Sequence, residues 1–217
     1  MKEEQNIFEF IDLGTVDYVE AWEKQKQQVE QCQQGAKDTI FLCEHPAVIT
    51  LGRLGNRENL LLLNEIKSRG IKIIDIDRGG DVTLHSPGQL VVYPVVDLRR
   101  FGRDLKFYLV KLEQVVIDFF KEFDILTERK PGKTGAWFGE KKIASIGIGV
   151  KKWISFHGMS LNMGNDLTLF SLIRPCGLDV QMTSLDEIKK EHVDLHKAKE
   201  MLVHIFSNTF TREMVNV

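Results

Sequence analysis

The sequence predicts an α/β (α+β) fold with a mixed β-sheet and flanking helices. Residues 16–34, 104–123 and 184–212 each repeat apolar side chains at helical spacing. Between these stretches lie short, alternating segments, and they lack the regular strand–helix–strand rhythm of a purely parallel sheet. A chain of 217 residues can bury a sizeable core, so we expect a single domain over residues 1–217.

The first half of the chain is expected to mix strands with two helices. Residues 7–13 alternate apolar and polar side chains as a strand does. Residues 16–34 carry Val19 and Trp22 on one side of an otherwise polar helix, and Gly70 is a typical residue for a helix end. In chain order we expect a strand at 7–13, a helix at 16–34, strands at 39–43 and 47–51, a helix at 59–68 and a strand at 71–76.

The second half is expected to contain most of the sheet. Asp104 precedes a strongly periodic apolar stretch and is a suitable N-cap for a helix. Residues 135–163 are alternating and rich in glycine, which indicates consecutive strands of one mixed or antiparallel sheet. We expect strands at 82–85 and 89–96, a helix at 104–123, strands at 135–138, 142–150 and 153–163, a short helix at 167–172 and a helical tail at 184–212.

Composition and charge narrow the class of protein. With 43% hydrophobic and 28% charged residues, the chain has the composition of an ordinary globular protein. A net charge of −2 argues against nucleic-acid binding, and the leucine run at 60–63 is too short to span a membrane. Three unevenly spaced cysteines fit a reducing compartment, and the first residues lack a secretory signal, so we expect a cytoplasmic protein, with the matrix of an organelle as the alternative.

A glycine turn between two strands is the most distinctive local feature. Gly79 and Gly80 let the backbone approach a ligand closely, and Arg78 can hold an anionic or carbonyl group beside them. His85 follows on the next strand. It can act as a general base, donate a hydrogen bond to a substrate carbonyl, or simply form a hydrogen bond with a neighbouring residue. The same alternatives apply to His157.

Two further residues can carry chemistry. Cys176 stands between a proline and a glycine, where a thiolate can project from a loop as a nucleophile or remain a buried structural thiol. Lys142 begins a strand of small and apolar residues, where it can point inward and accept a proton or stay solvated in a hairpin. His192 and His196 have helical metal-ligand spacing without a third ligand, so we expect no metal site.

These segments together resemble the lipoyl(octanoyl) transferase family. The resemblance is carried by Arg78-Gly79-Gly80, Thr83, His85, Pro87-Gly88-Gln89-Leu90 and Tyr93-Pro94. It continues in the family's order through residues 44–46, 50–53, 134–137, 142–144, 157–162, 175–177 and 183–185. The chain departs from the usual pattern at Leu84, Ser86 and Ser160, which leaves the reactive groups in place.

The resemblance implies the biotin/lipoate protein ligase-like fold and a cysteine/lysine acyltransferase. Cys176 would attack the thioester of an octanoyl-acyl carrier protein, and Lys142 would act as the general base. The acceptors would be lysines of lipoyl domains, in 2-oxoacid dehydrogenase complexes and in the glycine cleavage H protein. The family's acyl-binding segments map onto Arg78, Gly79, Gly80, Asp81, Val82, Thr83, Leu84 and His85, onto Ser145, Ile146 and Gly147, and onto Gly158, Met159 and Ser160.

Two other functions share parts of this pattern. Transfer from a thioester to an amide is downhill, so the resemblance implies no cofactor. An ATP-dependent lipoate or biotin protein ligase would share the glycine turn and the lysine, but it would not need Cys176. A non-catalytic protein that binds acyl groups or lipoyl domains would be expected to lose Lys142 or Cys176.

Overall fold

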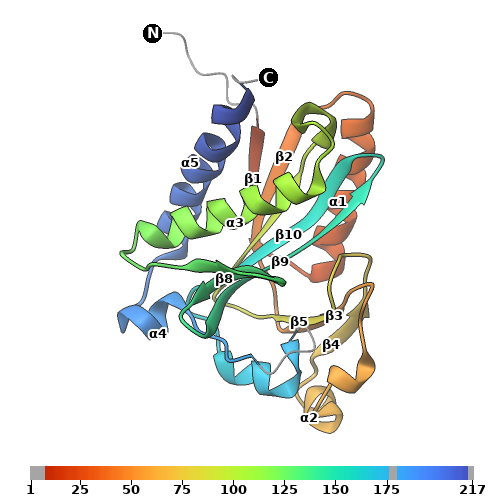
Figure 1. Ribbon diagram of the computed structural model, residues 1–217. Coiled ribbons are helices and arrows are strands. Elements are labelled where there is room, and N and C mark those ends of the chain that lie inside the picture. The colour runs from red at the N-terminus through yellow and green to blue at the C-terminus, as the bar shows by residue number, and fades with distance from the viewer. Residues whose placement is uncertain (1–7, 176–179, 215–217) are drawn as a thin grey trace.

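A mixed sheet forms the centre of the molecule (Figure 1). The computed structural model describes residues 8–175 and 180–214, and seven strands of this part pair in the order β1-β2-β6-β10-β9-β8-β7. The β1–β2 pair is parallel and the other pairs are antiparallel, which confirms the predicted mixed sheet. Its strands are β1 (Phe8–Thr15), β2 (Asp38–Glu44), β6 (Gln89–Val95), β7 (Glu128–Lys130), β8 (Lys133–Phe138), β9 (Lys141–Lys151) and β10 (Ile154–Asn162).

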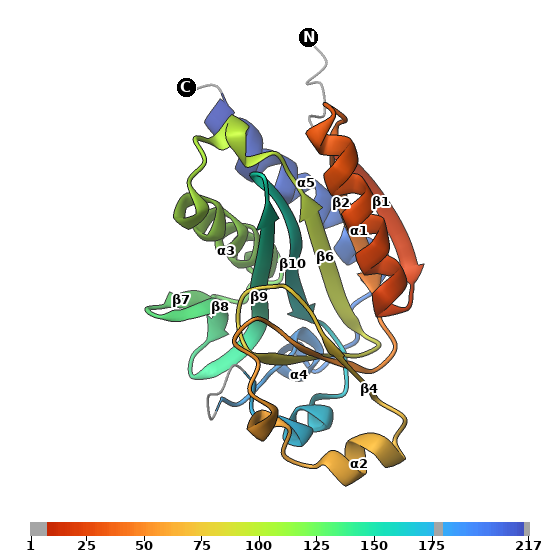
Figure 2. The ribbon, with the colours of Figure 1, turned by 90° about the vertical axis from the view of Figure 1, so that its right-hand side faces the viewer.

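Helices cover both faces of this sheet (Figures 1 and 2). Helix α1 (Tyr18–Gln33) packs on one face, and α3 (Leu105–Lys121) with α5 (Leu195–Met214) packs on the other. As predicted, the Asp104 carboxylate caps α3, accepting a hydrogen bond from the Phe107 N–H at 2.9 Å.

The predicted helical tail at 184–212 is divided into two helices. Helix α4 (Leu185–Lys189) is capped by Lys190, which has a left-handed φ of 58°, and α5 starts only at Leu195. A left-handed residue cannot continue an α-helix, so the apolar positions on the two sides of Lys190 belong to separate helices.

A second, three-stranded sheet lies at one end of the central sheet (Figure 1). Within the described chain it consists of β4 (Lys72–Asp75), β3 (Val48–Leu51) and β5 (Val82–His85), in that order. The predicted helix at 59–68 is instead a 3₁₀ turn, η1 (Arg57–Asn59), followed by α2 (Leu63–Ser68). The predicted helix at 167–172 is also of the 3₁₀ type, η3 (Leu167–Leu172), and packs in the same small core.

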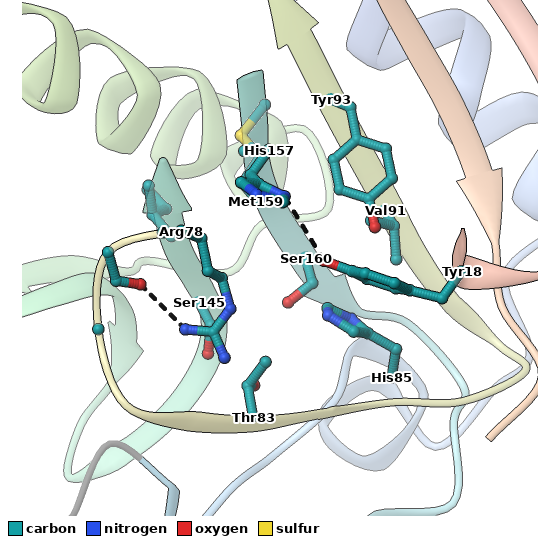
Figure 3. Close-up of a pocket in the computed structure, with 15 residues that line it drawn as sticks. Tyr18, Arg78, Thr83, His85, Val91, Tyr93, Ser145, His157, Met159 and Ser160 are labelled. Atoms are coloured by element: carbon teal, nitrogen blue, oxygen red, sulfur yellow. Dashed lines mark hydrogen bonds between the residues drawn. The ribbon is translucent and has the colours of Figure 1, made fainter. Parts of the chain in front are cut away.

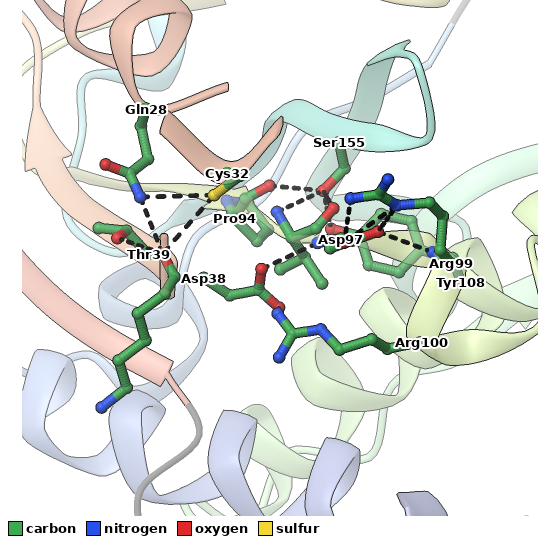
Figure 4. Close-up of polar contacts among 12 residues, drawn as sticks. Gln28, Cys32, Asp38, Thr39, Pro94, Asp97, Arg99, Arg100, Tyr108 and Ser155 are labelled. Carbon is green, nitrogen blue, oxygen red and sulfur yellow. Dashed lines mark hydrogen bonds and ion pairs between the residues drawn. The ribbon is translucent and has the colours of Figure 1, made fainter. Parts of the chain in front are cut away.

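The opposite end of the central sheet is fixed by buried polar contacts (Figure 4). The Asp38 carboxylate accepts a hydrogen bond from the Asp97 N–H at 3.0 Å and pairs with the guanidinium of Arg100, which lies in η2 (Leu98–Phe101). Burial raises the pKa of Asp38, and Arg100 opposes that change. Ser155 accepts or donates a 2.9 Å hydrogen bond with Tyr108 and so joins β10 to α3.

Candidate active site

A pocket opens between the central sheet and the small sheet (Figure 3). It contains about 470 Å³ of unfilled space, which includes open solvent at its mouth. Strands β5, β6, β9 and β10, the glycine turn and helix α1 all contribute side chains. The lining residues are Tyr18, Arg78, Gly79, Gly80, Thr83, His85, Val91, Tyr93, Ser145, Ile146, Gly147, His157, Gly158, Met159 and Ser160.

Close packing holds the glycine turn over strand β9. The Gly79 N–H donates to the Ile148 carbonyl at 2.7 Å. A Cβ atom on Gly147 would lie 2.9 Å from the Gly79 carbonyl oxygen, so a larger residue would push the turn away from the strand. Glycine at this position therefore allows the turn to form one wall of the pocket.

The Arg78 guanidinium binds the turn itself. It donates to the Thr50 carbonyl at 2.9 Å, to the Asp81 carbonyl at 2.8 Å and to the Gly79 carbonyl at 2.9 Å. The expectation that Arg78 holds a ligand's anionic or carbonyl group stays a prediction, and these contacts give the guanidinium a structural role as well. Since several donors of the guanidinium bond to backbone carbonyls, the side chain fixes the shape of the pocket wall.

Alternation along strand β5 separates the expected acyl-binding residues into two groups. Thr83 and His85 line the pocket, whereas Val82 and Leu84 point to the opposite side and pack in the core of the small sheet. Successive side chains of a strand point to opposite faces, so these four residues cannot all face one ligand. Asp81 also lies outside the lining, where its carboxylate accepts a hydrogen bond from the Asn56 N–H at 2.8 Å.

A chain of buried amides fixes the protonation of His85. The Asn162 Nδ2 donates to the Thr183 carbonyl at 3.0 Å, and the Gln89 Nε2 donates to Asn162 Oδ1 at 2.8 Å. Gln89 Oε1 must then accept the 2.7 Å bond from His85 Nδ1, which places the proton on Nδ1. Burial lowers the pKa of His85 to about 3, so the ring is neutral near pH 7.

His157 has an unusual backbone conformation beside the pocket. Its φ is 55°, although it lies within a strand, and its N–H donates to the Gln25 side chain of α1 at 2.8 Å. Its Nε2 lies 2.8 Å from the Asp77 carboxylate, while burial lowers the pKa of the imidazole. A neutral ring that donates from Nε2 to Asp77 leaves Nδ1 to accept from the Tyr18 hydroxyl, 3.5 Å away (Figure 3).

Lys142 lies where β9 meets the chain that leads to α4. Its N–H donates to the Gln181 carbonyl at 2.9 Å, and its carbonyl accepts from the Thr183 N–H at 3.0 Å. The side chain is buried, with Nζ 5.6 Å from the centre of the Trp137 ring. A Cβ atom on Gly135 would lie 2.8 Å from Lys142 Cε, so that glycine leaves room for the lysine.

Cys176 lies outside the described residues, and the chain on either side of it is anchored. The Arg174 N–H donates to the Asn59 carbonyl at 2.8 Å, and Gln181 pairs with Lys142. The two free cysteines in the described part, Cys32 and Cys43, are both buried, and burial raises the pKa of each thiol.

Eleven of the fourteen expected acyl-binding residues line the pocket, and four other lining residues were not predicted as such. His157 stands in the matched segment 157–162, directly before Gly158, but it is not among the expected acyl-binding residues. Val91 and Tyr93 could have been found from alternation along β6, since both share one face of the strand. Tyr18 carries no such signal, because it comes from a distant helix.

Other kinds of site receive no support from the geometry. Across residues 8–175 and 180–214, no three histidine, cysteine or acidic side chains gather in a way that could hold a metal ion. Every helix of the same ranges is too short or too polar to cross a bilayer.

The fold is that of the lipoate and biotin protein ligases. A lipoate-protein ligase A bound with ATP matches 94% of this chain and 85% of its own with a TM-score of 0.78 at 16% identity. A bipartite lipoate protein ligase of Thermoplasma acidophilum, studied together with its E2 lipoyl domain, is also similar. The match covers 94% of this chain and 83% of that one, with a TM-score of 0.75 at 16% identity. The match to the biotin protein ligase of Aquifex aeolicus covers 94% of this chain and 71% of that one, with a TM-score of 0.60 at 16% identity.

Within this fold, the chain belongs to the lipoyl protein ligase A/B catalytic domain family, whose model matches residues 17–207. It is 44% identical over 205 residues to the octanoyltransferase of Solibacter usitatus, covering 94% of this chain and 93% of that protein. It is 43% identical over 202 residues to the octanoyltransferase of Syntrophotalea carbinolica, covering 92% and 93%. These relatives confirm the resemblance stated from the sequence.

Proposed function

We propose that this protein is an octanoyltransferase that moves an octanoyl group from acyl carrier protein to the lysine of a lipoyl domain. The names of its relatives and the presence of both Lys142 and Cys176 support this activity. The observation that carries the proposed mechanism is the pairing of Lys142 with residues 181–183, five to seven positions after Cys176. That pairing joins the backbone at Lys142 to the chain that follows Cys176, which supports a shared role for the two residues.

The first half of the reaction loads the enzyme. The Cys176 thiol gives its proton to Lys142 Nζ, and the thiolate attacks the carbonyl carbon of the octanoyl thioester. The carbon–sulfur bond to the carrier protein breaks, and the departing thiolate takes the proton back from Lys142. The products are an octanoyl-cysteine thioester and a free carrier thiol.

The second half transfers the acyl group to an amine. The acceptor lysine attacks the carbonyl carbon of the acyl-enzyme, and Lys142 accepts a proton from the attacking nitrogen. The bond to Cys176 Sγ breaks, an amide forms, and the proton returns to the thiolate. Each half exchanges one acyl bond for another, so neither step requires a nucleotide.

The pocket supports the binding of a medium-length acyl chain. Ser145 and Ser160 face each other across β9 and β10, and the lining beyond them includes Ile146, Met159 and Val91. Burial of each methylene contributes about 0.8 kcal/mol, which favours an octanoyl group over an acetyl group. We further propose that the protein acts in the cytoplasm, where reduced thiols persist.

Intact-protein mass spectrometry tests the mechanism. The wild type and Cys176→Ser are each mixed with octanoyl-acyl carrier protein without ATP. We expect one octanoyl adduct on the wild type that is labile to hydroxylamine, and no such adduct on the variant. Cys32→Ser is a matched control, because this buried cysteine lies in the last turn of α1, at the opposite end of that helix from Tyr18, and its loss should leave the adduct in place.

The same experiment separates the alternatives. In one outcome, the wild type gives no adduct from the thioester but transfers octanoate once ATP and magnesium are supplied. That result would make the protein an ATP-dependent ligase, like the lipoate protein ligases that share its fold. If neither condition gives transfer to a lipoyl domain, the proposed activity is wrong and a binding function remains.

A further inference from the structure

Tyr18 closes the pocket from a helix that contributes no other lining residue. It is the first residue of α1 and is 3% exposed. Its ring stacks on His85 with the ring centres 5.7 Å apart and the planes inclined by 20°. Figure 3 shows the ring reaching across the pocket from the α1 side toward His157.

The position of Tyr18 is fixed by neighbours on three sides. Its ring meets Tyr93 edge to face with centres 6.4 Å apart, and it packs against His45 at 5.2 Å. His45 is itself held by the Val16 carbonyl at 2.7 Å and by the Tyr93 hydroxyl at 2.7 Å. A side chain confined in this way forms a rigid wall and does not move aside for a longer ligand.

His157 supports the Tyr18 hydroxyl from the other side. Three groups hold His157: Gln25 at its N–H, Asp77 at Nε2 and Tyr18 at Nδ1. A φ of 55° is unfavourable for a non-glycine residue inside a strand. Such a conformation persists only when several contacts with the surrounding structure hold it in place. The conformation directs the imidazole toward Tyr18 at the pocket end.

The pocket runs along β9 and β10 from a pair of serines to this wall. Ser145 pairs with Ser160, and His157 pairs with Ile148, three residues further along β9. Three residues of strand span roughly 10 Å at about 3.3 Å each. The wall at Tyr18 therefore lies several methylene groups away from the serine pair.

We infer that Tyr18 is the specificity-determining residue that limits the length of the acyl group. The inference rests on the proposed function, since it takes the pocket to hold the acyl chain. Removal of the ring would extend the cavity toward His45 and Tyr93, where additional methylenes find apolar contacts with the buried Val16 and Val91.

The test is a competition between chain lengths. Wild type, Tyr18→Ala, Tyr18→Leu and Tyr18→Phe are each mixed with equal amounts of octanoyl-, decanoyl- and dodecanoyl-acyl carrier protein, and the adduct masses are compared. Each buried methylene is worth about a factor of four in binding. Decanoyl has two more methylenes than octanoyl, so we expect Tyr18→Ala and Tyr18→Leu to raise the ratio of decanoyl to octanoyl adduct by roughly fifteenfold.

Tyr18→Phe is the matched control, because it removes the hydroxyl and keeps the ring. We expect its ratio of decanoyl to octanoyl adduct to equal that of the wild type. Val19→Ala changes the next residue, which is 42% exposed, and should also leave the ratio unchanged.

The outcomes are distinct. An unchanged ratio in Tyr18→Ala, or in Tyr18→Leu if the alanine variant does not fold by circular dichroism, overturns the length limit and leaves the octanoyltransferase proposal intact. A ratio that rises equally in Tyr18→Phe also overturns it, because the ring would not be the determinant. No adduct of any length on the wild type refutes the proposed function, and the length limit with it.

Discussion

The N–H of Thr183 donates a hydrogen bond to the carbonyl oxygen of Lys142, and the two atoms are 3.0 Å apart. The Thr183 carbonyl in turn accepts a bond from Asn162, which continues through Gln89 to His85. The backbone beside the candidate base and the pocket wall thus belong to one buried hydrogen-bonded system. A buried network of this kind holds its members in one arrangement, because any movement would leave a buried polar group without a hydrogen-bond partner.

Replacement of Lys142 by alanine is expected to reduce octanoyl transfer to a lipoyl domain by roughly 10²–10⁴-fold, because it removes the general base. The measurement is the single-turnover rate with octanoyl-acyl carrier protein. Lys141→Ala is the control, since the neighbouring lysine is only half-buried and its side chain pairs with Glu187. Near-normal transfer by Lys142→Ala would assign the base to another residue.

Replacement of Asn162 by leucine is expected to destabilise the fold and to slow acyl loading. The change leaves Gln89 Nε2 and the Thr183 carbonyl without their partner, and an unsatisfied buried group costs about 1–3 kcal/mol. The melting temperature should fall by roughly 2–4 °C for each kcal/mol. Asn208→Leu is the matched control, because this exposed asparagine should change stability by less than about 0.5 kcal/mol. Equal melting temperatures for the two variants would contradict the network.

Substitution of Gly52 by alanine is expected to raise the KM for octanoyl-acyl carrier protein. A Cβ atom there would overlap the Gly80 carbonyl oxygen and lie 2.9 Å from that of Arg78, so the glycine turn must shift. Steady-state kinetics provide the measurement. Gly139→Asn is the control, since that hairpin glycine has open space and a φ of 55° that asparagine tolerates. An unchanged KM would mean that the turn does not bound the substrate site.

Acid is expected to destabilise the protein through His85. Its pKa is about 3 when folded and near 6.5 when unfolded, so between these values the unfolded chain binds a proton that the folded chain does not. The stabilisation is therefore present above about pH 6.5 and is lost as the pH falls, at up to about 1.4 kcal/mol per pH unit.

Urea unfolding at several pH values between about 7 and 5 tests this linkage, above the range where carboxylates titrate. His85→Gln should give a shallower dependence of the unfolding free energy on pH than the wild type. His196→Gln, at a site whose side chain is 77% exposed, should leave the dependence unchanged. The same slope in all three proteins would exclude His85 as the responsible group.

Several parts of the fold and site could be predicted from local patterns. Asp104 caps α3 as its position before a periodic apolar stretch indicates, and residues 135–163 form strands of one sheet. Thr83 and His85 share a strand face because side chains alternate, and the same rule places Leu84 in the core. The roles of Lys142 and Cys176 remain predictions from the family resemblance.

The sequence alone determined most of the elements, the mixed α/β class and the family, because hydrophobic period, caps, glycine turns and ordered motifs are local properties of the chain. The tertiary structure decided which distant residues meet. It brought Tyr18 against His85 and His157, turned the Arg78 guanidinium toward the Thr50 carbonyl, and paired Lys142 with Thr183. These contacts depend on how separate elements pack, and no spacing within a single segment encodes them.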